Sequence, residues 1–173
     1  KLCRFENMEK PVILIIGGST GSRAINTAIR DLLPELLKRY NIIHLCGKGN
    51  LDETLKDTDG YAQFEYANKE LADMFALASL VISRAGANAI CELLALHKPN
   101  ILIPLSAAAS RGDQILNANS FRSSGYSYVL EEEAVTNTAL LEAIDHVFSH
   151  KERLCGSQWK KVMVRIRSLP LSL

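Results

Sequence analysis

Five consecutive aliphatic residues, Val12 to Ile16, end at the glycine pair Gly17-Gly18. A continuous apolar run of this length is typical of a strand that is buried on both faces, as in a parallel sheet covered by helices. Over the next segment, 22–39, apolar residues recur at helical spacing, which predicts a helix packed on that sheet. We expect Pro34 to kink or split this helix, because proline lacks the N–H group that a helix interior needs.

The same alternation of short apolar runs and helical segments continues along the chain. Further strands are predicted at 41–45, 62–66, 80–83, 101–103 and 128–130, and further helices at 51–56, 70–78, 87–96, 114–123 and 136–149. This alternation predicts an α/β fold with a doubly wound, Rossmann-like parallel sheet. We expect residues 1–10 to be a linker from a preceding domain, 11–150 to form the Rossmann-like domain, and 151–173 to form a C-terminal amphipathic helix.

Composition excludes several classes of protein. The formal net charge of +1 disfavours nucleic-acid binding, which needs a concentrated basic surface. No apolar run approaches the roughly 18 residues that a membrane-spanning helix requires. The four cysteines, Cys3, Cys46, Cys91 and Cys155, include no CxxC pair, so neither a zinc site nor a disulfide framework is expected.

Ligands of open parallel sheets bind outside the carboxyl ends of the strands, so the junctions after the predicted strands are the places to search. The first junction contains Gly18, Ser19, Thr20, Gly21 and Arg23. Glycines allow close approach of the backbone, and the N-terminus of the following helix favours an anion, so we expect a phosphate contact here. The loop is neither a GxGxxG fingerprint nor a Walker A loop, and a glycine turn needed only for packing is the alternative.

The second junction follows the strand predicted at 80–83. Its candidate residues are Arg84, Gly86, Ala87, Asn88, Ala89, Ile90, Cys91 and Glu92. Small residues again leave a helix N-terminus open to an anion. Glu92 is placed either to accept the two hydroxyls of a ribose or as an ordinary solvated residue. Arg84 is either a phosphate ligand or one half of a structural ion pair.

The third junction, 104–114, is a long loop of small residues that leads into a helix. Asp113 and Gln114 each offer a planar polar group for sugar hydroxyls, although Asp113 also suits a helix cap. Other polar residues are expected to have structural or surface roles. The four histidines are expected to pack or to lie at the surface, Gly47-Lys48-Gly49 to form a turn, and Glu131–Glu133 to form a solvated turn.

Three segments, GGSTGSRAIN, SRAGANAICEL and RGDQILNA, together resemble the MurG family of bacterial N-acetylglucosaminyltransferases. The resemblance covers nearly the whole chain but only the C-terminal half of the family's proteins. It implies a GT-B architecture, in which two Rossmann-like domains face each other across a cleft and this half binds UDP-GlcNAc. It also implies that Ser19 contacts the diphosphate, that 87–92 wrap the nucleotide with Glu92 on the ribose, and that Gln114 contacts the sugar.

Two further site features follow from the same resemblance. The backbone around Ala67 would edge the uracil. Some family members carry two glutamines where this chain has Asp113-Gln114, so the second sugar contact is an acid here.

The reaction that the resemblance implies is inverting transfer of GlcNAc from UDP-GlcNAc to lipid I, which gives lipid II and UDP in peptidoglycan synthesis. No cofactor or metal is expected, because helix dipoles and backbone N–H groups would stabilise the leaving diphosphate. The catalytic base and the lipid I site would belong to the N-terminal domain, so no catalytic residue is assigned to this chain. The whole enzyme is expected at the cytoplasmic side of the membrane, attached peripherally.

Two alternatives remain open at this point. One is the donor domain of another GT-B enzyme, such as a diacylglycerol glycosyltransferase. The other is a non-catalytic nucleotide-sugar-binding subunit that a separate partner chain completes.

Overall fold

The computed structural model describes residues 5–18, 20–107 and 112–150. Within these residues six parallel strands form one sheet in the order β3-β2-β1-β4-β5-β6, which confirms the predicted fold class. The strands are β1 Val12–Ile16, β2 Asn41–Leu45, β3 Tyr61–Phe64, β4 Ala78–Ser83, β5 Asn100–Leu102 and β6 Tyr128–Val129. The strand order reverses between β1 and β4, and a crevice opens at such a point because the flanking connections leave on opposite faces.

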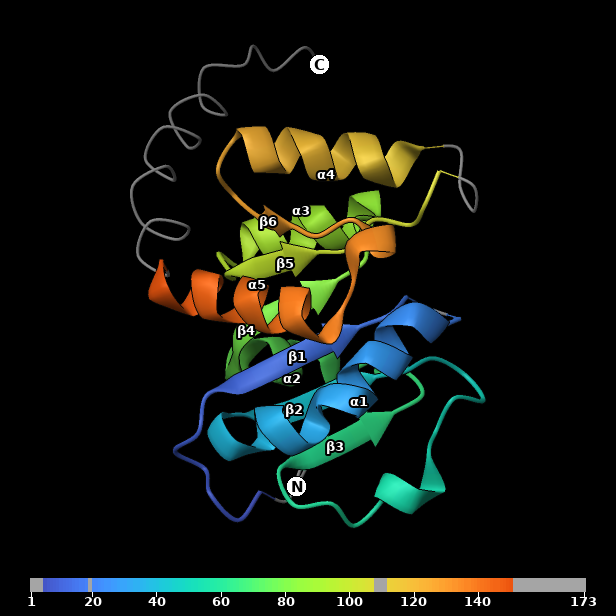
Figure 1. The fold of residues 1–173 in the computed structure, drawn as a ribbon, viewed down its shortest axis with the longest axis vertical. Coiled ribbons are helices and arrows are strands. Elements are labelled where there is room, and N and C mark those ends of the chain that lie inside the picture. The colour runs from blue at the N-terminus through green and yellow to red at the C-terminus, as the bar shows by residue number, and fades with distance from the viewer. Residues whose placement is uncertain (1–4, 19, 108–111, 151–173) are drawn as a thin grey trace.

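Helices cover both faces of the sheet (Figure 1). The helices α1 (Arg23–Arg39) and α5 (Asn137–Ser149) lie on one face, with their buried residues in one hydrophobic cluster. The helices α2 (Leu71–Leu77), α3 (Ala87–Ala95) and α4 (Asp113–Ser123) contribute to a second cluster on the other face. Two short 3-10 helices, η1 (Glu53–Leu55) and η2 (Glu132–Ala134), lie in connecting segments.

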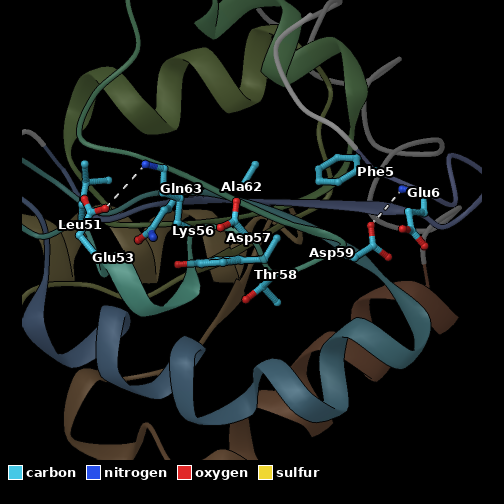
Figure 2. Close-up of a pocket in the computed structure, with 11 residues that line it drawn as sticks. Phe5, Glu6, Leu51, Glu53, Lys56, Asp57, Thr58, Asp59, Ala62 and Gln63 are labelled. Carbon is cyan, nitrogen blue, oxygen red and sulfur yellow. Dashed lines mark hydrogen bonds and ion pairs between the residues drawn. The ribbon is translucent and has the colours of Figure 1, made fainter.

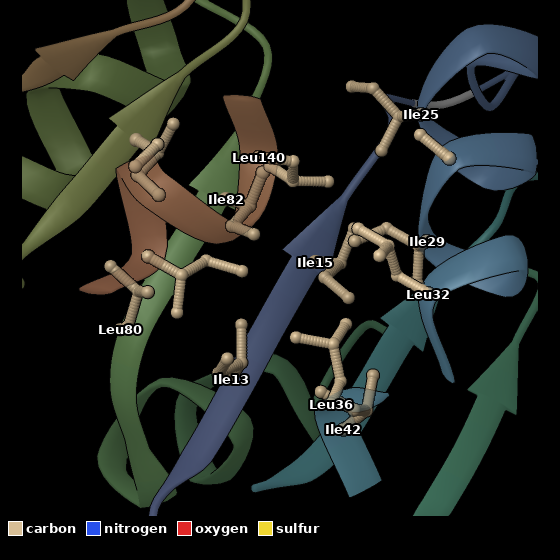
Figure 3. Close-up of a cluster of buried hydrophobic side chains, with 14 of the residues drawn as sticks. Ile13, Ile15, Ile25, Ile29, Leu32, Leu36, Ile42, Leu80, Ile82 and Leu140 are labelled. Carbon is tan, nitrogen blue, oxygen red and sulfur yellow. The ribbon is translucent and has the colours of Figure 1, made fainter. Parts of the chain in front are cut away.

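The alternation of side chains along β1 divides the core into these two layers. Ile13 and Ile15 point toward α1 and α5, where Figure 3 shows them among the aliphatic side chains of those helices. Leu14 belongs to the opposite cluster, and all three side chains are fully buried. Burial on both faces explains why the strand is apolar at every position. The packing on both faces also holds in place the end of the strand, where the first loop begins.

Two local predictions are wrong. The helix α1 runs unbroken through Pro34, so the expected split is absent. Pro34 is exposed, so the hydrogen bond that it cannot donate is missing on the outer side of the helix. The helix predicted at 51–56 is the single turn η1, which Asp52 caps by accepting the N–H of Thr54 at 3.0 Å. The predicted helix at 151–167 lies outside the described residues.

Candidate functional site

Two cavities meet where the carboxyl ends of β1 and β4 lie side by side. The larger has a volume of about 560 Å³ and the smaller about 320 Å³. Both are lined by Ile16, Gly18, Ser83 and Ala89. The larger is also lined by Gly17, Thr20, Gly21, Arg84, Gly86, Ala87, Asn88, Leu105 and Gln114, and the smaller by Leu45, Glu65, Tyr66, Ala67, Asn68, Leu71, Phe75, Glu92 and Leu93. The shared floor makes them two compartments of one cleft, which we call the crossover cleft.

The loop after β1 is interlocked with the loop after β2. Gly21 has a φ of +78°, and a Cβ atom added to it would lie 2.1 Å from the carbonyl oxygen of Cys46. A Cβ atom on Gly47 would in turn lie 2.3 Å from the backbone nitrogen of Gly21. These two glycines therefore permit a backbone-to-backbone approach that no side chain allows. Gly47 acts as a support behind the cleft and does not line it.

Gly18 uses its freedom differently. Its φ is +93°, but no heavy atom lies within 4 Å of an added Cβ, because the residue faces the cleft. The neighbouring carbonyl of Thr20 is held from behind by the side-chain amide of Asn50, which donates to it at 3.2 Å. The loop after β1 thus exposes its backbone to the cleft on one side and is held by Asn50 on the other.

The N-terminus of α3 opens into the larger compartment. Gly86 precedes the helix in an extended conformation and provides no side-chain cap. The first N–H that donates within the helix is that of Ile90, to the carbonyl of Gly86 at 3.0 Å. The N–H groups of Ala87, Asn88 and Ala89 come before it, and all three residues line the cleft. Such a helix start attracts an anion through its N–H groups and its dipole.

Gln114, in the first turn of α4, faces the α3 N-terminus across the same compartment. Its side-chain oxygen accepts the backbone N–H of Leu105 at 3.0 Å. An N–H donor requires an oxygen opposite it, so this contact fixes which end of the amide is which. The amide nitrogen is therefore the end that Gln114 can offer to a ligand in the cleft.

Arg84 makes the ion pair that one of its two predicted roles requires, and a phosphate contact by the same residue stays a prediction. It forms an ion pair with Glu132, and the two side chains are only 11% and 17% exposed. It also donates to Ser22 Oγ at 2.6 Å and to the carbonyls of Ile103 and Pro104 at 3.3 Å each. Its charge is neutralised, and its terminal nitrogens are already engaged inside the protein.

Glu132 makes contacts that sequence reasoning missed. The prediction of a solvated turn at 131–133 is wrong for it, because its carboxylate pairs with Arg84 and also accepts the N–H of Ser106 at 3.1 Å. Nothing in a run of three glutamates distinguishes the middle one. Its partner lies 48 positions earlier, so only the fold brings the two charges together.

A buried polar chain lies under the interlocked loops. His44 is fully buried, with Nε2 2.9 Å from Asn26 Oδ1 and Nδ1 2.9 Å from the Tyr61 hydroxyl. Asn26 donates its amide nitrogen to the carbonyl of Cys46 at 2.9 Å, so its oxygen must accept the His44 proton. Nε2 therefore carries the proton, and Tyr61 donates to Nδ1. Burial, followed by the nearby charge of Arg30, lowers the pKa of His44 from 6.5 to about 3.

This buried histidine predicts a loss of stability in mild acid. The folded chain keeps His44 neutral, whereas the unfolded chain takes up a proton below about pH 6.5, so stability falls as the pH drops from 6.5 toward 3. We expect the free energy of unfolding to lose about 2 kcal/mol from this group between pH 7 and pH 5. Urea titrations of the wild type and of His44→Asn at both pH values measure it. A wild-type-minus-variant difference that is the same at pH 7 and pH 5 contradicts the assignment.

One further hollow lies apart from the crossover cleft, and another adjoins it through Arg84 and Leu105, which line both. Figure 2 shows one of about 720 Å³ beside β3, where the N–H of Glu6 donates to Asp59 at 3.0 Å and holds the N-terminal segment in place. None of the residues predicted for the site lines it. A hollow of about 640 Å³ lies between α1 and η2, and Arg23 lines that one and not the crossover cleft.

Among residues 5–18, 20–107 and 112–150, no three His, Cys, Asp or Glu side chains are grouped closely enough to hold a metal ion. In the same ranges no helix combines the length and the apolar character that crossing a membrane requires.

The sequence profile of the glycosyltransferase family 28 C-terminal domain matches residues 12–163. This chain belongs to that family. The family 28 domain is 63% identical over 142 residues to the UDP-N-acetylglucosamine--N-acetylmuramyl-(pentapeptide) pyrophosphoryl-undecaprenol N-acetylglucosamine transferase of Lachnoclostridium phytofermentans, which confirms the resemblance to the MurG family. The match covers 82% of this chain and 40% of that relative, so the chain spans about two fifths of the relative's length.

Solved structures agree on the fold of the family 28 domain. It superposes on MurG of Acinetobacter baumannii with a TM-score of 0.70 at 23% identity, over 95% of this chain and 52% of that one. It superposes on ALG13 with a TM-score of 0.53 at 17% identity, over 87% of this chain and 97% of that one. The same architecture therefore occurs both as half of a larger chain and as nearly a whole one.

The crossover cleft of the family 28 domain gathers most of the residues predicted for the site. The larger compartment contains those from the three junctions: Gly18, Thr20, Gly21, Arg84, Gly86, Ala87, Asn88, Ala89 and Gln114. Ala67 and Glu92 line the smaller one together with Tyr66, whose side chain is 63% exposed and which sequence reasoning passed over.

Four of the predicted site residues are not brought into the cleft, and one of them is Arg23, which lines the hollow between α1 and η2. Ile90 is buried in the core, while Cys91 and Asp113 are exposed and line neither compartment. Ser19 lies outside the described residues. The ligand contacts assigned to all these positions stay predictions.

Proposed function

We propose that this chain is the donor-binding domain of a GT-B enzyme that transfers GlcNAc from UDP-GlcNAc to lipid I and so forms lipid II. One observation carries the proposal. The two compartments of the crossover cleft share four lining residues, so the α3 N-terminus, Glu92 and Gln114 lie around adjoining spaces. An anion-binding helix start, a carboxylate and a fixed amide donor around adjoining spaces match the diphosphate, ribose and sugar of a nucleotide sugar.

The donor takes the following position in this proposal. The diphosphate lies against the N–H groups of Ala87, Asn88 and Ala89 and against the backbone around Gly18. The uridine occupies the smaller compartment, with the base near Ala67 and the ribose hydroxyls on Glu92. The GlcNAc extends through the larger compartment toward the amide nitrogen of Gln114.

The chemistry follows from where charge develops. When the acceptor hydroxyl attacks the anomeric carbon from the face opposite the diphosphate, the configuration inverts and UDP leaves with added negative charge. N–H groups already aimed at that diphosphate stabilise the charge without reorganising. We assign the base and the lipid I site to the part of the relatives that this chain does not span. The chain alone is expected to bind the donor without turnover, and the whole enzyme to act peripherally at the cytoplasmic side of the membrane.

Calorimetric titration of the chain tests the donor site. We expect UDP-GlcNAc and UDP to bind and ADP to bind at least about 10-fold more weakly, because the backbone beside Ala67 is proposed to hold the uracil edge, which adenine does not present. UDP-GalNAc, which differs at one sugar hydroxyl, reports on the contact to Gln114. Equal affinity for UDP and ADP, or turnover of lipid I by this chain alone, contradicts the proposed division of roles.

A second candidate is a subunit that a separate acceptor-binding chain completes. The ALG13 match favours it, because a solved chain of the same fold consists almost wholly of this one domain. Sequencing upstream of the Lys1 codon separates the two candidates. An in-frame acceptor domain supports the first, and an immediate stop codon supports the second.

A further inference from the structure

We propose that Glu132 is a positioning residue for sugar recognition, acting through the segment 103–106 on the amide of Gln114. The inference rests on the proposed function, since it concerns how the donor's sugar is read. Glu132 does not line the crossover cleft and touches no part of the predicted ligand position. Its effect is carried by two backbone N–H groups.

Two consecutive backbone amides are held by side chains from different elements. The N–H of Ser106 donates to Glu132 Oε2 at 3.1 Å, and the N–H of Leu105 donates to Gln114 Oε1 at 3.0 Å. Glu132 comes from η2 and Gln114 from α4. The two amides are separated by a single Cα, so holding the N–H of Ser106 on Glu132 restricts the positions open to the N–H of Leu105, which orients the amide of Gln114.

Arg84 completes the clamp on the same segment. One terminal nitrogen of Arg84 donates to the carbonyls of Ile103 and Pro104, and the other pairs with Glu132. Arg84 therefore ties the segment 103–106 to Glu132. The segment is thus held through two carbonyls and two N–H groups. Arg84 and Glu132 are 11% and 17% exposed, so water competes poorly for either charge.

Loss of the carboxylate should affect the sugar more than the nucleotide. Without it the N–H of Ser106 loses a charged acceptor, the segment 105–106 gains freedom, and the Gln114 amide is no longer held in one orientation. The proposed diphosphate contacts come from the N-terminus of α3 and the backbone around Gly18, neither of which belongs to this segment. We therefore expect the affinity for UDP-GlcNAc to fall by about 10-fold and that for UDP by less than about 3-fold.

The test compares Glu132→Gln with Glu131→Gln by calorimetric titration of the chain with UDP-GlcNAc and with UDP. Glu131 is the adjacent residue, pairs with Arg122 in an ion pair about half exposed, and has no contact with 103–106. The control should match the wild type with both ligands. A Glu132→Gln variant that loses affinity equally for both ligands, or loses none, overturns the proposal.

A ligand-free readout separates this inference from the proposed function. Amide hydrogen exchange should be at least about 10-fold faster at Leu105 and Ser106 in Glu132→Gln, and unchanged in Glu131→Gln. If the wild type binds no UDP-GlcNAc, the proposed function fails, and unchanged exchange at these amides overturns the positioning role by itself.

A double variant keeps the test valid if Glu132→Gln does not fold. Arg84→Met with Glu132→Leu replaces the pair by apolar side chains of similar volume, which proteins often tolerate. Wild-type preference for UDP-GlcNAc over UDP in that folded double variant overturns the proposal, and loss of the preference supports it.

Discussion

The substitution Gly21→Ala is expected to destabilise the chain by about 3–5 kcal/mol, because it places a side chain at a positive φ and creates a severe steric overlap. The φ of +78° is costly for any L side chain, and the new Cβ atom would lie 2.1 Å from the carbonyl oxygen of Cys46. That oxygen cannot retreat freely, because it also accepts the side-chain amide of Asn26 at 2.9 Å. Urea unfolding of Gly21→Ala measures the loss.

Gly49→Ala provides the matched control. Its φ is +73°, close to that of Gly21, but no heavy atom lies within 4 Å of the added Cβ. It should therefore cost only the backbone term, about 1 kcal/mol. Similar losses in the two variants would mean that the loops after β1 and β2 are not interlocked as described.

Replacement of Glu92 by alanine should weaken UDP binding by about 100-fold, the effect expected when a carboxylate that accepts two hydroxyl groups is removed. Stability should change by less than about 0.5 kcal/mol, since the side chain is exposed. Within the described residues the Glu92 carboxylate makes no hydrogen bond or ion pair, so its removal leaves no protein partner unsatisfied. Calorimetric titration with UDP, together with urea unfolding, measures both quantities.

The deoxyribose analogue makes the result specific to the ribose. The wild type should prefer UDP to dUDP by at least about 10-fold, and Glu92→Ala should bind the two nearly equally. Glu142→Ala, an exposed glutamate in α5 on the opposite face, should retain the preference. An undiminished preference in Glu92→Ala would remove Glu92 from the ribose contact.

The parts of the fold and site that the sequence predicts are those encoded by neighbouring residues. The aliphatic run 12–16 is buried on both faces, and the small residues before α3 and in the loop after β1 do line the cleft. The sequence also predicts that the side chain of Ile90 is buried, because its spacing from Leu93 places both residues on the same side of α3. Its assignment to the site rests on the resemblance, which implies that 87–92 wrap the nucleotide, and stays a prediction.

The parts that the sequence does not predict depend on residues far apart in the chain. Arg84 and Glu132 are separated by 48 positions, and His44 meets Asn26 and Tyr61 from different elements. A buried polar residue and a solvated one look alike until the fold supplies the partner. The prediction of a solvated turn at 131–133 fails at Glu132 for that reason.

The contact between Gly21 and Gly47 also limits how the cleft can respond to a ligand. Neither loop can swing independently, since each occupies the space that the other would need. The backbone amides at this edge of the sheet are therefore ordered before an anion binds. Binding there should lose little further conformational entropy and should require little rearrangement of the loops.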